Sequence, residues 1–293
     1  MLFSSLTFLF VFLPVVLIVY NILPMKAKNL WLLAASLSFY FYGEPRYLLL
    51  MLAVIFSSYI FGLLTEKAQG TKRKIILAVS VAVSLSALIF FKYTDFFISV
   101  SNGIFNTDFD LLKIALPIGI SFYTFQAISY NIDVYRGDTP AQKNPLSLAL
   151  YISLFPQLIA GPIVQYKDIE RQLKERTVTI EKFYDGVIFF IKGLGKKVLF
   201  ANTIGAVYTD VVAGDVASLS VVSAWIAVIC YTLQIYFDFS GYSDMAIGLG
   251  QMVGFQFLEN FNYPYISKTI TEFWRRWHIS LGTWFRDYVY FPL

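Results

Sequence analysis

Six long stretches of this chain contain no charged side chain, and this feature constrains the fold more than any other. Each is close to the length of about 17–25 residues that an α-helix needs to cross a bilayer core. The stretches are Met1–Met25, Tyr47–Thr65, Ile75–Phe91, Ile114–Ile132, Asn144–Tyr166 and Val216–Phe237. Only 14% of the residues are charged, whereas soluble domains carry about 25%. The sequence therefore predicts an all-α integral membrane protein with many spans.

The N-terminal stretch predicts a permanent span, because a secretory signal would have a basic segment before the apolar run and a small-residue cleavage site. Asn29–Gly43 is shorter, so it is either a partial span or a helix extended by its flanks. Cys230 is the only cysteine, which excludes an intrachain disulfide and a cysteine-based metal cluster. The net charge of +4 is modest and does not indicate a nucleic-acid partner.

Loop charges predict the topology, because short cytoplasmic loops collect Lys and Arg. The clearest basic loop contains Lys67, Lys72, Arg73 and Lys74. Counting spans from this loop places the N-terminus outside the cytoplasm, together with the acidic loop that contains Asp95, Asp108 and Asp110. We therefore expect a multi-pass protein with an external N-terminus.

The stretch Asn144–Tyr166 has basic residues on both sides, so both of its ends are expected in the cytoplasm. Pro156 and Pro162 interrupt helical backbone within it. These features favour a re-entrant segment over the alternative, a kinked span. Non-helical backbone at membrane depth persists only inside protein or beside a watery cavity. Residues Phe155–Ile163 are therefore predicted to form a cavity wall.

The next two segments differ in how their charged residues are arranged, and each arrangement predicts a different position relative to the membrane. Lys167–Lys182 alternates in charge sign with i,i+4 pairs, which predicts a helix at the membrane interface. Lys192, Lys196 and Lys197 then interrupt the apolar pattern of Phe183–Val207. Charges within a span avoid lipid, so these lysines either extend toward the membrane surface or line a cavity for a polyanionic ligand.

A polar group follows the last charge-free stretch and precedes another apolar run, Met245–Leu258. It contains Asp238, Ser240, Ser243 and Asp244. Carboxylates at a membrane boundary need partners or water. One interpretation is that Ser240 or Ser243 caps a helix that begins near Asp244, and the alternative is a role in chemistry.

The single histidine, His278, lies in the most specific segment. Thr269–Glu272 has capping-box spacing, so a helix is expected to begin there. On that helix Trp274, His278, Leu281 and Phe285 would share one face. Burial among aromatic rings would lower the pKa of the imidazole and keep it neutral, as a general base requires. A metal site is not expected without a second histidine, and a hydrogen-bonded structural histidine is the alternative to catalysis.

This segment resembles the Trp-rich helix that marks the membrane-bound O-acyltransferase family. It reads Trp274-Arg-Arg-Trp277-His278-Ile-Ser-Leu-Gly-Thr-Trp284-Phe-Arg-Asp-Tyr288. Further segments resemble the alginate O-acetyltransferase branch of that family and extend the likeness over nearly the whole chain. They are Met1–Pro14, Ser38–Glu44, Leu116–Gln126, Phe155–Pro162 and Tyr236–Asp244.

The resemblance implies a multi-span ring of helices with re-entrant parts around a central tunnel. It also implies transfer of an acyl group from a cytoplasmic thioester, acetyl-CoA or an acyl carrier protein, to hydroxyls of an exported polysaccharide such as alginate. No tightly bound cofactor is expected. His278 would be the catalytic residue, near the cytoplasmic side of a bacterial inner membrane. The implied substrate-binding residues are Trp274, Trp277, Gln126, Asp238, Ser240 and Asp244.

The expected partners are the lipid bilayer and either the polysaccharide acceptor or a periplasmic or extracellular acetyltransferase. Family members usually carry a second histidine in a later apolar helix, and this sequence stops at Leu293 before reaching it. The resemblance thus implies that residues 1–293 form a single membrane domain of a longer protein, inactive in isolation, in which His278 is the base or a supporting residue. Two other classes remain as alternatives: a transporter or flippase for a lipid-linked or anionic substrate, and a membrane scaffold that docks a partner acyltransferase.

Overall fold

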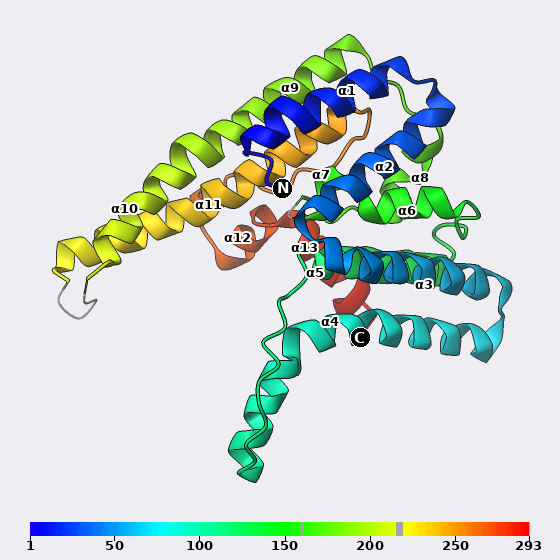
Figure 1. Ribbon diagram of the computed structural model, residues 1–293, viewed down its shortest axis with the longest axis horizontal. Coiled ribbons are helices and arrows are strands. Elements are labelled where there is room, and N and C mark those ends of the chain that lie inside the picture. The colour runs from blue at the N-terminus through cyan, green and yellow to red at the C-terminus, as the bar shows by residue number, and fades with distance from the viewer. Residues whose placement is uncertain (160, 215–218, 293) are drawn as a thin grey trace. The chain divides into compact units, whose positions relative to one another are not determined.

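The computed structural model describes residues 1–159, 161–214 and 219–292. Over these ranges the chain forms helices joined by turns and extended loops, and no β-strand occurs among them (Figure 1). The all-α prediction is therefore confirmed. The helices belong to two compact units: unit 1 contains Met1–Ile22 and Glu175–Leu293, and unit 2 contains Leu23–Ile159 and Ile163–Lys174. A single membrane domain over residues 1–293 stays a prediction.

Unit 1 is built on one long helix, α11, which runs from Val221 to Met252. Packed along it are α9 (Ile180–Gly195), the π-helical segment η3 (Lys196–Ala201) and α10 (Asn202–Val212), which follow one another directly (Figure 1). The other elements are η1 (Phe8–Phe12), α1 (Leu13–Ile22), η5 (Pro264–Ile266), α12 (Ile270–Arg276), α13 (Ile279–Phe285) and η6 (Arg286–Tyr290).

Glycines set the separation between α9 and α11. A Cβ added at Gly193 would lie 2.5 Å from the carbonyl oxygen of Gly241, and one added at Gly248 would lie 2.5 Å from the carbonyl oxygen of Gly186. Small residues let two helix backbones approach this closely. The pairing of Gly186 with Gly248 and of Gly193 with Gly241 also makes the two helices antiparallel. This register carries η3 alongside the middle of α11.

Unit 2 contains the remaining helices. They are α2 (Met25–Gly43), η2 (Pro45–Tyr47), α3 (Leu48–Lys67), α4 (Gly70–Phe105), α5 (Ile120–Arg136), α6 (Pro145–Ser153), α7 (Phe155–Leu158) and α8 (Tyr166–Lys174). The helix α5 packs against both α3 and α4. Its tyrosines Tyr123 and Tyr130 are fully buried, and a Cβ added at Gly62 of α3 would lie 2.7 Å from the Tyr130 hydroxyl. The helix α5 is thus the centre of this unit.

Three helices among the described residues are long and apolar enough to cross a membrane, namely Pro45–Lys67, Gly70–Phe105 and Val221–Met252. They coincide with three of the predicted stretches, although residues 216–218 of the last stretch lie outside the described residues. The apolar helix Phe8–Ile22 is shorter. Asn29–Gly43 belongs to a helix extended by its N-terminal flank, because α2 begins at Met25.

The predicted span Ile114–Ile132 is wrong in its first part. Helix α5 begins only at Ile120, because Pro117 and Gly119 precede it and Gly119 has a left-handed backbone with φ 77°. An added Cβ at Gly119 would lie 2.7 Å from the carbonyl oxygen of Leu158, so the close approach also requires glycine. The residues that precede Ile120 form no helix after α4 ends.

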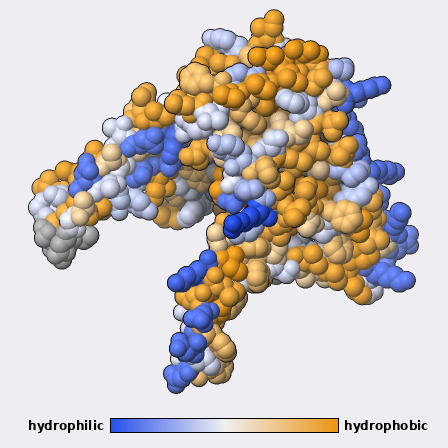
Figure 2. All heavy atoms as spheres, in the orientation of Figure 1, coloured by the Kyte–Doolittle hydropathy of each residue, from blue (hydrophilic) through white to orange (hydrophobic). Residues whose placement is uncertain are grey.

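Apolar side chains cover much of the surface that Figure 2 shows. Leu49 of α3, Ile104 of α4 and Val221 of α11 expose 75%, 67% and 75% of their surface. Large exposed apolar areas are a liability in water, whereas a bilayer core solvates them. These three helices therefore have the exterior of membrane spans.

The stretch Asn144–Tyr166 is not one straight helix. Helix α6 ends at Ser153, Leu154 has non-helical backbone, and α7 is a single turn. The Ser36 hydroxyl accepts a hydrogen bond from Phe155 N at 3.1 Å, and Gln157 Nε2 donates to the carbonyl of Tyr151. The predicted break is confirmed, and α7 is buried inside the protein. Re-entry into a membrane and a cavity wall at residues 155–163, of which residue 160 lies outside the described residues, stay predictions.

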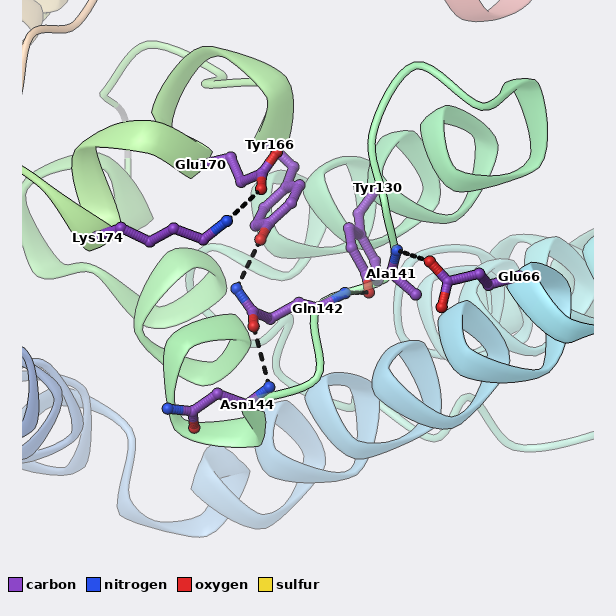
Figure 3. Close-up of polar contacts among 8 residues, drawn as sticks. All are labelled: Glu66, Tyr130, Ala141, Gln142, Asn144, Tyr166, Glu170 and Lys174. Atoms are coloured by element: carbon purple, nitrogen blue, oxygen red, sulfur yellow. Dashed lines mark hydrogen bonds and ion pairs between the residues drawn. The ribbon is translucent and has the colours of Figure 1, made fainter.

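The loop between α5 and α6 is fixed by hydrogen bonds from both of its sides (Figure 3). Ala141 N donates to Glu66 Oε1 of α3 at 2.8 Å, and Gln142 N donates to the Tyr130 hydroxyl at 2.9 Å. The Gln142 side chain in turn donates to the Tyr166 hydroxyl at 2.7 Å. Gln142 thereby joins α5 to the first residue of α8.

The predicted interfacial helix Lys167–Lys182 is shorter than expected. Helix α8 ends at Lys174, where the predicted i,i+4 pair with Glu170 is present at 2.7 Å (Figure 3). A separate helix, α9, then begins at Ile180 after the N-cap Thr179, whose side chain accepts a hydrogen bond from Lys182 N. Because Thr179 caps the start of a new helix, the charged segment Lys167–Lys182 is divided between α8 and α9.

Candidate functional site

His278 lies between two short helices, and the prediction of one continuous helix is wrong. Helix α12 ends at Arg276, Trp277 is extended with φ −102° and ψ 126°, and His278 has a left-handed backbone with φ 44° and ψ 55°. Helix α13 begins at Ile279. Trp274, His278, Leu281 and Phe285 therefore do not form one helical face.

The break follows from pairing with a segment earlier in the chain. Asn262 N donates to the carbonyl of Arg276 at 2.9 Å, and Ile279 N donates to the carbonyl of Asn260 at 2.9 Å. These bonds satisfy backbone groups on both sides of Trp277 that a continuous helix would have paired internally. A left-handed non-glycine residue costs roughly 1–3 kcal/mol, so the surrounding structure holds His278 in place.

The predicted start of the segment is confirmed. Thr269 is the N-cap of α12, and its side chain accepts a hydrogen bond from Glu272 N at 3.1 Å. The Glu272 carboxylate accepts from Lys268 N at 3.0 Å and forms an ion pair with Arg276 at 2.9 Å. These contacts lower the pKa of Glu272, with the backbone hydrogen bond as the largest cause. Glu272 and Arg276 of α12 are thus paired with each other.

The imidazole of His278 is surrounded by aromatic rings, as the sequence predicted. The Phe239 ring of α11 packs edge-on against it at 4.7 Å between centroids, and the Phe261 ring stacks at 6.4 Å. Burial lowers the pKa of His278 to about 4. The ring is therefore neutral at physiological pH, and one of its nitrogens carries a lone pair.

Asn260, which the sequence reasoning did not single out, holds the other edge of this ring. Its Oδ1 lies 3.1 Å from His278 Nδ1, 3.1 Å from Ser280 N and 2.9 Å from Ser280 Oγ. Asn260 is 1% exposed. The sequence signal that could have found it is the pair of amides, Asn260 and Asn262, beside a glycine-rich apolar segment.

Trp277 and Trp274 have different surroundings. The Trp277 ring contacts Phe261 at 5.1 Å and Phe273 at 5.7 Å, so it shares Phe261 with His278. Trp274 is 61% exposed and contacts Phe273 at 5.3 Å. Trp277 therefore belongs to the aromatic cluster around His278, and Trp274 lies at its edge.

Asp238 and Asp244 form ion pairs with two of the lysines that interrupt the apolar segment Phe183–Val207. Lys197 Nζ lies 2.7 Å from Asp238 Oδ1, and Lys196 Nζ lies 2.5 Å from Asp244 Oδ2. Neither alternative predicted for these lysines, extension toward the membrane surface or a cavity for a polyanion, included these pairs. The aspartates are thus engaged by the protein itself.

The predicted helix start near Asp244 is wrong, because α11 continues through this region to Met252. Ser240 and Ser243 are interior helix residues that cap nothing, and both are fully buried. The hydroxyl of Ser243 has no hydrogen-bond partner within the residues that the structure describes. The adjacent Phe239 contacts His278, so α11 brings the segment from Asp238 to Ser240 toward the imidazole.

Gln126, the remaining predicted site residue, belongs to unit 2, whereas all the others belong to unit 1. It lies on α5 and is 1% exposed. Its Oε1 has no hydrogen-bond partner in the part of the chain that the structure describes. A role in substrate binding stays a prediction for Gln126, as it does for Trp274, Trp277, Asp238, Ser240 and Asp244.

Comparison with known proteins supplies the family. Residues 78–293 match the model of the membrane-bound O-acyltransferase family. The chain is 48% identical to the probable alginate O-acetylase AlgI of Pseudomonas aeruginosa, over 100% of this chain and 57% of that protein. It is 37% identical to the peptidoglycan O-acetyltransferase of Helicobacter pylori, over 100% of this chain and 62% of that protein.

A third relative, the teichoic acid D-alanyltransferase of Bacillus subtilis, is 31% identical over 59% of this chain and 44% of that protein. The chain spans 57% and 62% of the length of the Pseudomonas and Helicobacter relatives. The matched segment includes α11, the aromatic cluster and His278. The chain is a membrane protein that belongs to the membrane-bound O-acyltransferase family.

Proposed function

We propose that this chain forms part of an O-acyltransferase that moves an acyl group, most simply acetyl, from a cytoplasmic thioester to a polysaccharide hydroxyl. The names of its relatives support this class, since they describe alginate O-acetylation, peptidoglycan O-acetylation and D-alanyl transfer to teichoic acid. The donor would be acetyl-CoA or an acyl carrier protein. The acceptor would be alginate or a similar exported polymer, reached directly or through a periplasmic or extracellular acetyltransferase.

The observation that carries the proposal is the neutral imidazole of His278 inside the family's aromatic motif. A hydroxyl is a poor nucleophile, so acyl transfer needs a group that removes its proton as the new C–O bond forms. The lone pair of a neutral ring can do this, whereas a protonated ring cannot.

The low pKa of His278 also sets a condition on this role. A base with a pKa of about 4 accepts a proton less readily than one with a pKa near 7, by about 4 kcal/mol. The oxyanion that develops on the thioester carbonyl offsets part of this difference, because it would lie close to the new imidazolium in a water-poor site. We propose that His278 acts as the base only when the acyl donor is in place.

The test is substitution of His278 by Ala and by Gln in the complete protein, followed by measurement of polymer acetylation in cells and in isolated membranes. Acetylation should fall at least about 100-fold, the usual contribution of a general base. Unchanged acetylation at normal expression would remove His278 from the mechanism. Acetyl transfer by the purified 293-residue chain alone would contradict the expectation that this chain is inactive in isolation.

The transporter alternative rested on broken helices and on lysines within an apolar segment, and the second of these observations is weakened. Lys196 and Lys197 form ion pairs with aspartates of the same protein, so they are not vacant receptors for an anionic substrate. A scaffold would need no histidine, and the His278 variants separate it from an enzyme. The helical ring with a tunnel, the external N-terminus and a cytoplasmic location for His278 remain proposals.

A further inference from the structure

The amide of Asn260 fixes which nitrogen of His278 carries the proton. Three groups converge on the Oδ1 atom of Asn260: His278 Nδ1, Ser280 N and Ser280 Oγ, at 3.1, 3.1 and 2.9 Å. The hydrogen-bonding capacity of these partners decides which end of the amide faces them.

Ser280 N decides the orientation of the amide. A backbone N–H can only donate a hydrogen bond, so the atom of Asn260 that faces it has to be the oxygen. Turning the amide over would set its NH2 group against the N–H of Ser280, donor against donor, in a site that excludes water. The opposite end of the amide does not decide the orientation, because Asn260 Nδ2 is buried and has no hydrogen-bond partner among the described residues.

The orientation of the amide then decides the tautomer of the ring. Asn260 Oδ1 can only accept, so His278 Nδ1 has to be the protonated nitrogen that donates to it. A neutral imidazole carries one N–H and one lone pair. The lone pair of His278 is therefore on Nε2, the nitrogen that faces away from Asn260.

We infer that Asn260 is a positioning residue that holds His278 as the Nδ1–H tautomer, so that Nε2 is the atom that takes the hydroxyl proton. This inference rests on the proposed function for its chemical meaning. The tautomer itself follows from hydrogen-bond geometry alone, and the two can fail separately.

No charged group near the ring in the described part of the chain contacts a ring nitrogen, so none of them determines which nitrogen of His278 is protonated. Phe239 and Phe261 face the imidazole with apolar rings. Arg276, two residues before it, is paired with Glu272 at 2.9 Å, and Glu259 beside Asn260 is exposed. Asn260 is thus the polar side chain that contacts a ring nitrogen in the described part of the chain.

The tautomer can be measured directly by NMR. Residues 1–293 contain a single histidine, His278. The complete protein is purified with an affinity tag that contains no histidine, labelled with 15N-histidine and examined in detergent or lipid at pH 7. The signals of His278 are those that disappear in His278→Gln, and they should show Nδ1 protonated and Nε2 unprotonated. A protonated Nε2 with a bare Nδ1 would overturn the inference, and this measurement needs no activity.

Variants then test the role of Asn260 in the complete protein. Asn260→Ala should lower kcat for acetylation roughly 100-fold or more with little change in KM, because the free ring no longer presents Nε2 as the lone pair. Asn260→Asp keeps the acceptor oxygen and should restore the tautomer and most of the activity. Asn262→Ala is the matched control, since Asn262 contributes backbone bonds to this region and should retain normal activity.

The pH profile separates positioning from a merely structural role. The carboxylate of Asn260→Asp stabilises the imidazolium, so the pKa of His278 and the acidic limb of the rate profile should both move upward. Two results together would overturn the positioning role of Asn260: an acidic limb that does not move in Asn260→Asp, and an Nδ1–H tautomer that persists in Asn260→Ala. If NMR shows the Nδ1–H tautomer but His278→Ala remains fully active, the inferred hydrogen-bond geometry is supported and the proposed function is overturned.

Discussion

The pair between Lys196 and Asp244 offers a quantitative test of what the aspartates of α11 do. Asp244→Asn removes the carboxylate that lies 2.5 Å from Lys196 Nζ and leaves that ammonium without its partner. Breaking a buried ion pair costs roughly 3–5 kcal/mol, and an exposed pair is worth about 0.2–1 kcal/mol. The side chains are 31% and 18% exposed, which places this pair between the two limits.

We therefore expect Asp244→Asn to destabilise the protein by about 2 kcal/mol, after allowance for solvent screening. In a chain of this size such a loss lowers the midpoint of thermal unfolding by roughly 3–4 °C. The matched control is Asp238→Asn, whose pair with Lys197 is more open because Asp238 is 45% exposed. This control should lose about half as much or less.

A double variant distinguishes two causes of the expected loss of stability: the Lys196 ammonium left without a partner, and the lost contact between the two side chains. Lys196→Met with Asp244→Leu removes both charges and keeps apolar volume, and such replacements of buried pairs are often neutral or stabilising. Unfolding in detergent, followed by a thiol-independent fluorescence signal, should return to the midpoint of the unaltered protein. The reasoning is refuted by an Asp244→Asn loss no larger than that of Asp238→Asn, or by a double variant that recovers nothing. Recovery of stability without recovery of acetylation would show that the pair of Lys196 and Asp244 also contributes to activity.

Three further predictions concern other parts of the molecule. Because burial holds the pKa of His278 near 4, kcat/KM for acetylation should stay flat as pH falls through 6.5 and decline only near pH 4; a midpoint at the unperturbed value would contradict the buried ring. Gly193→Ala places a Cβ 2.5 Å from the carbonyl of Gly241, and thermal unfolding should show a loss of about 1–3 kcal/mol; a neutral effect would contradict the close packing. With Cys230 replaced by Ser, a cysteine at position 72 (Lys72→Cys) should resist an impermeant maleimide added outside intact cells and react after lysis; external labelling would reverse the predicted topology.

The features that were predictable from sequence are those encoded by neighbouring residues. The apolar runs that became α3, α4 and part of α11 needed only length and the absence of charge. The break before Phe155 was predictable because proline is close by, and the helix start at Thr269 was predictable because Glu272, the other residue of the capping-box pattern, lies three residues away.

The features that were missed depend on contacts between distant residues. Nothing near Trp277 and His278 marks a helix end, because the break is set by backbone bonds to Asn260 and Asn262. Conversely, Ser240 and Ser243 were interpreted as possible caps of a helix that begins near Asp244, yet α11 is continuous there and Gly241 packs against Gly193. Tertiary contacts overrode local preference in both cases.

The left-handed backbone of His278 sets stability against activity at a single position. Glycine adopts φ 44° without the steric penalty of a Cβ, so His278→Gly would relieve strain even as it removes the imidazole. The relief of strain is opposed by the loss of the ring's packing against Phe239 and Phe261 and of its hydrogen bond to Asn260. Selection for polymer acetylation should remove glycine from this position. Thermostabilised variants intended for structural work would need to be screened for the loss of this ring.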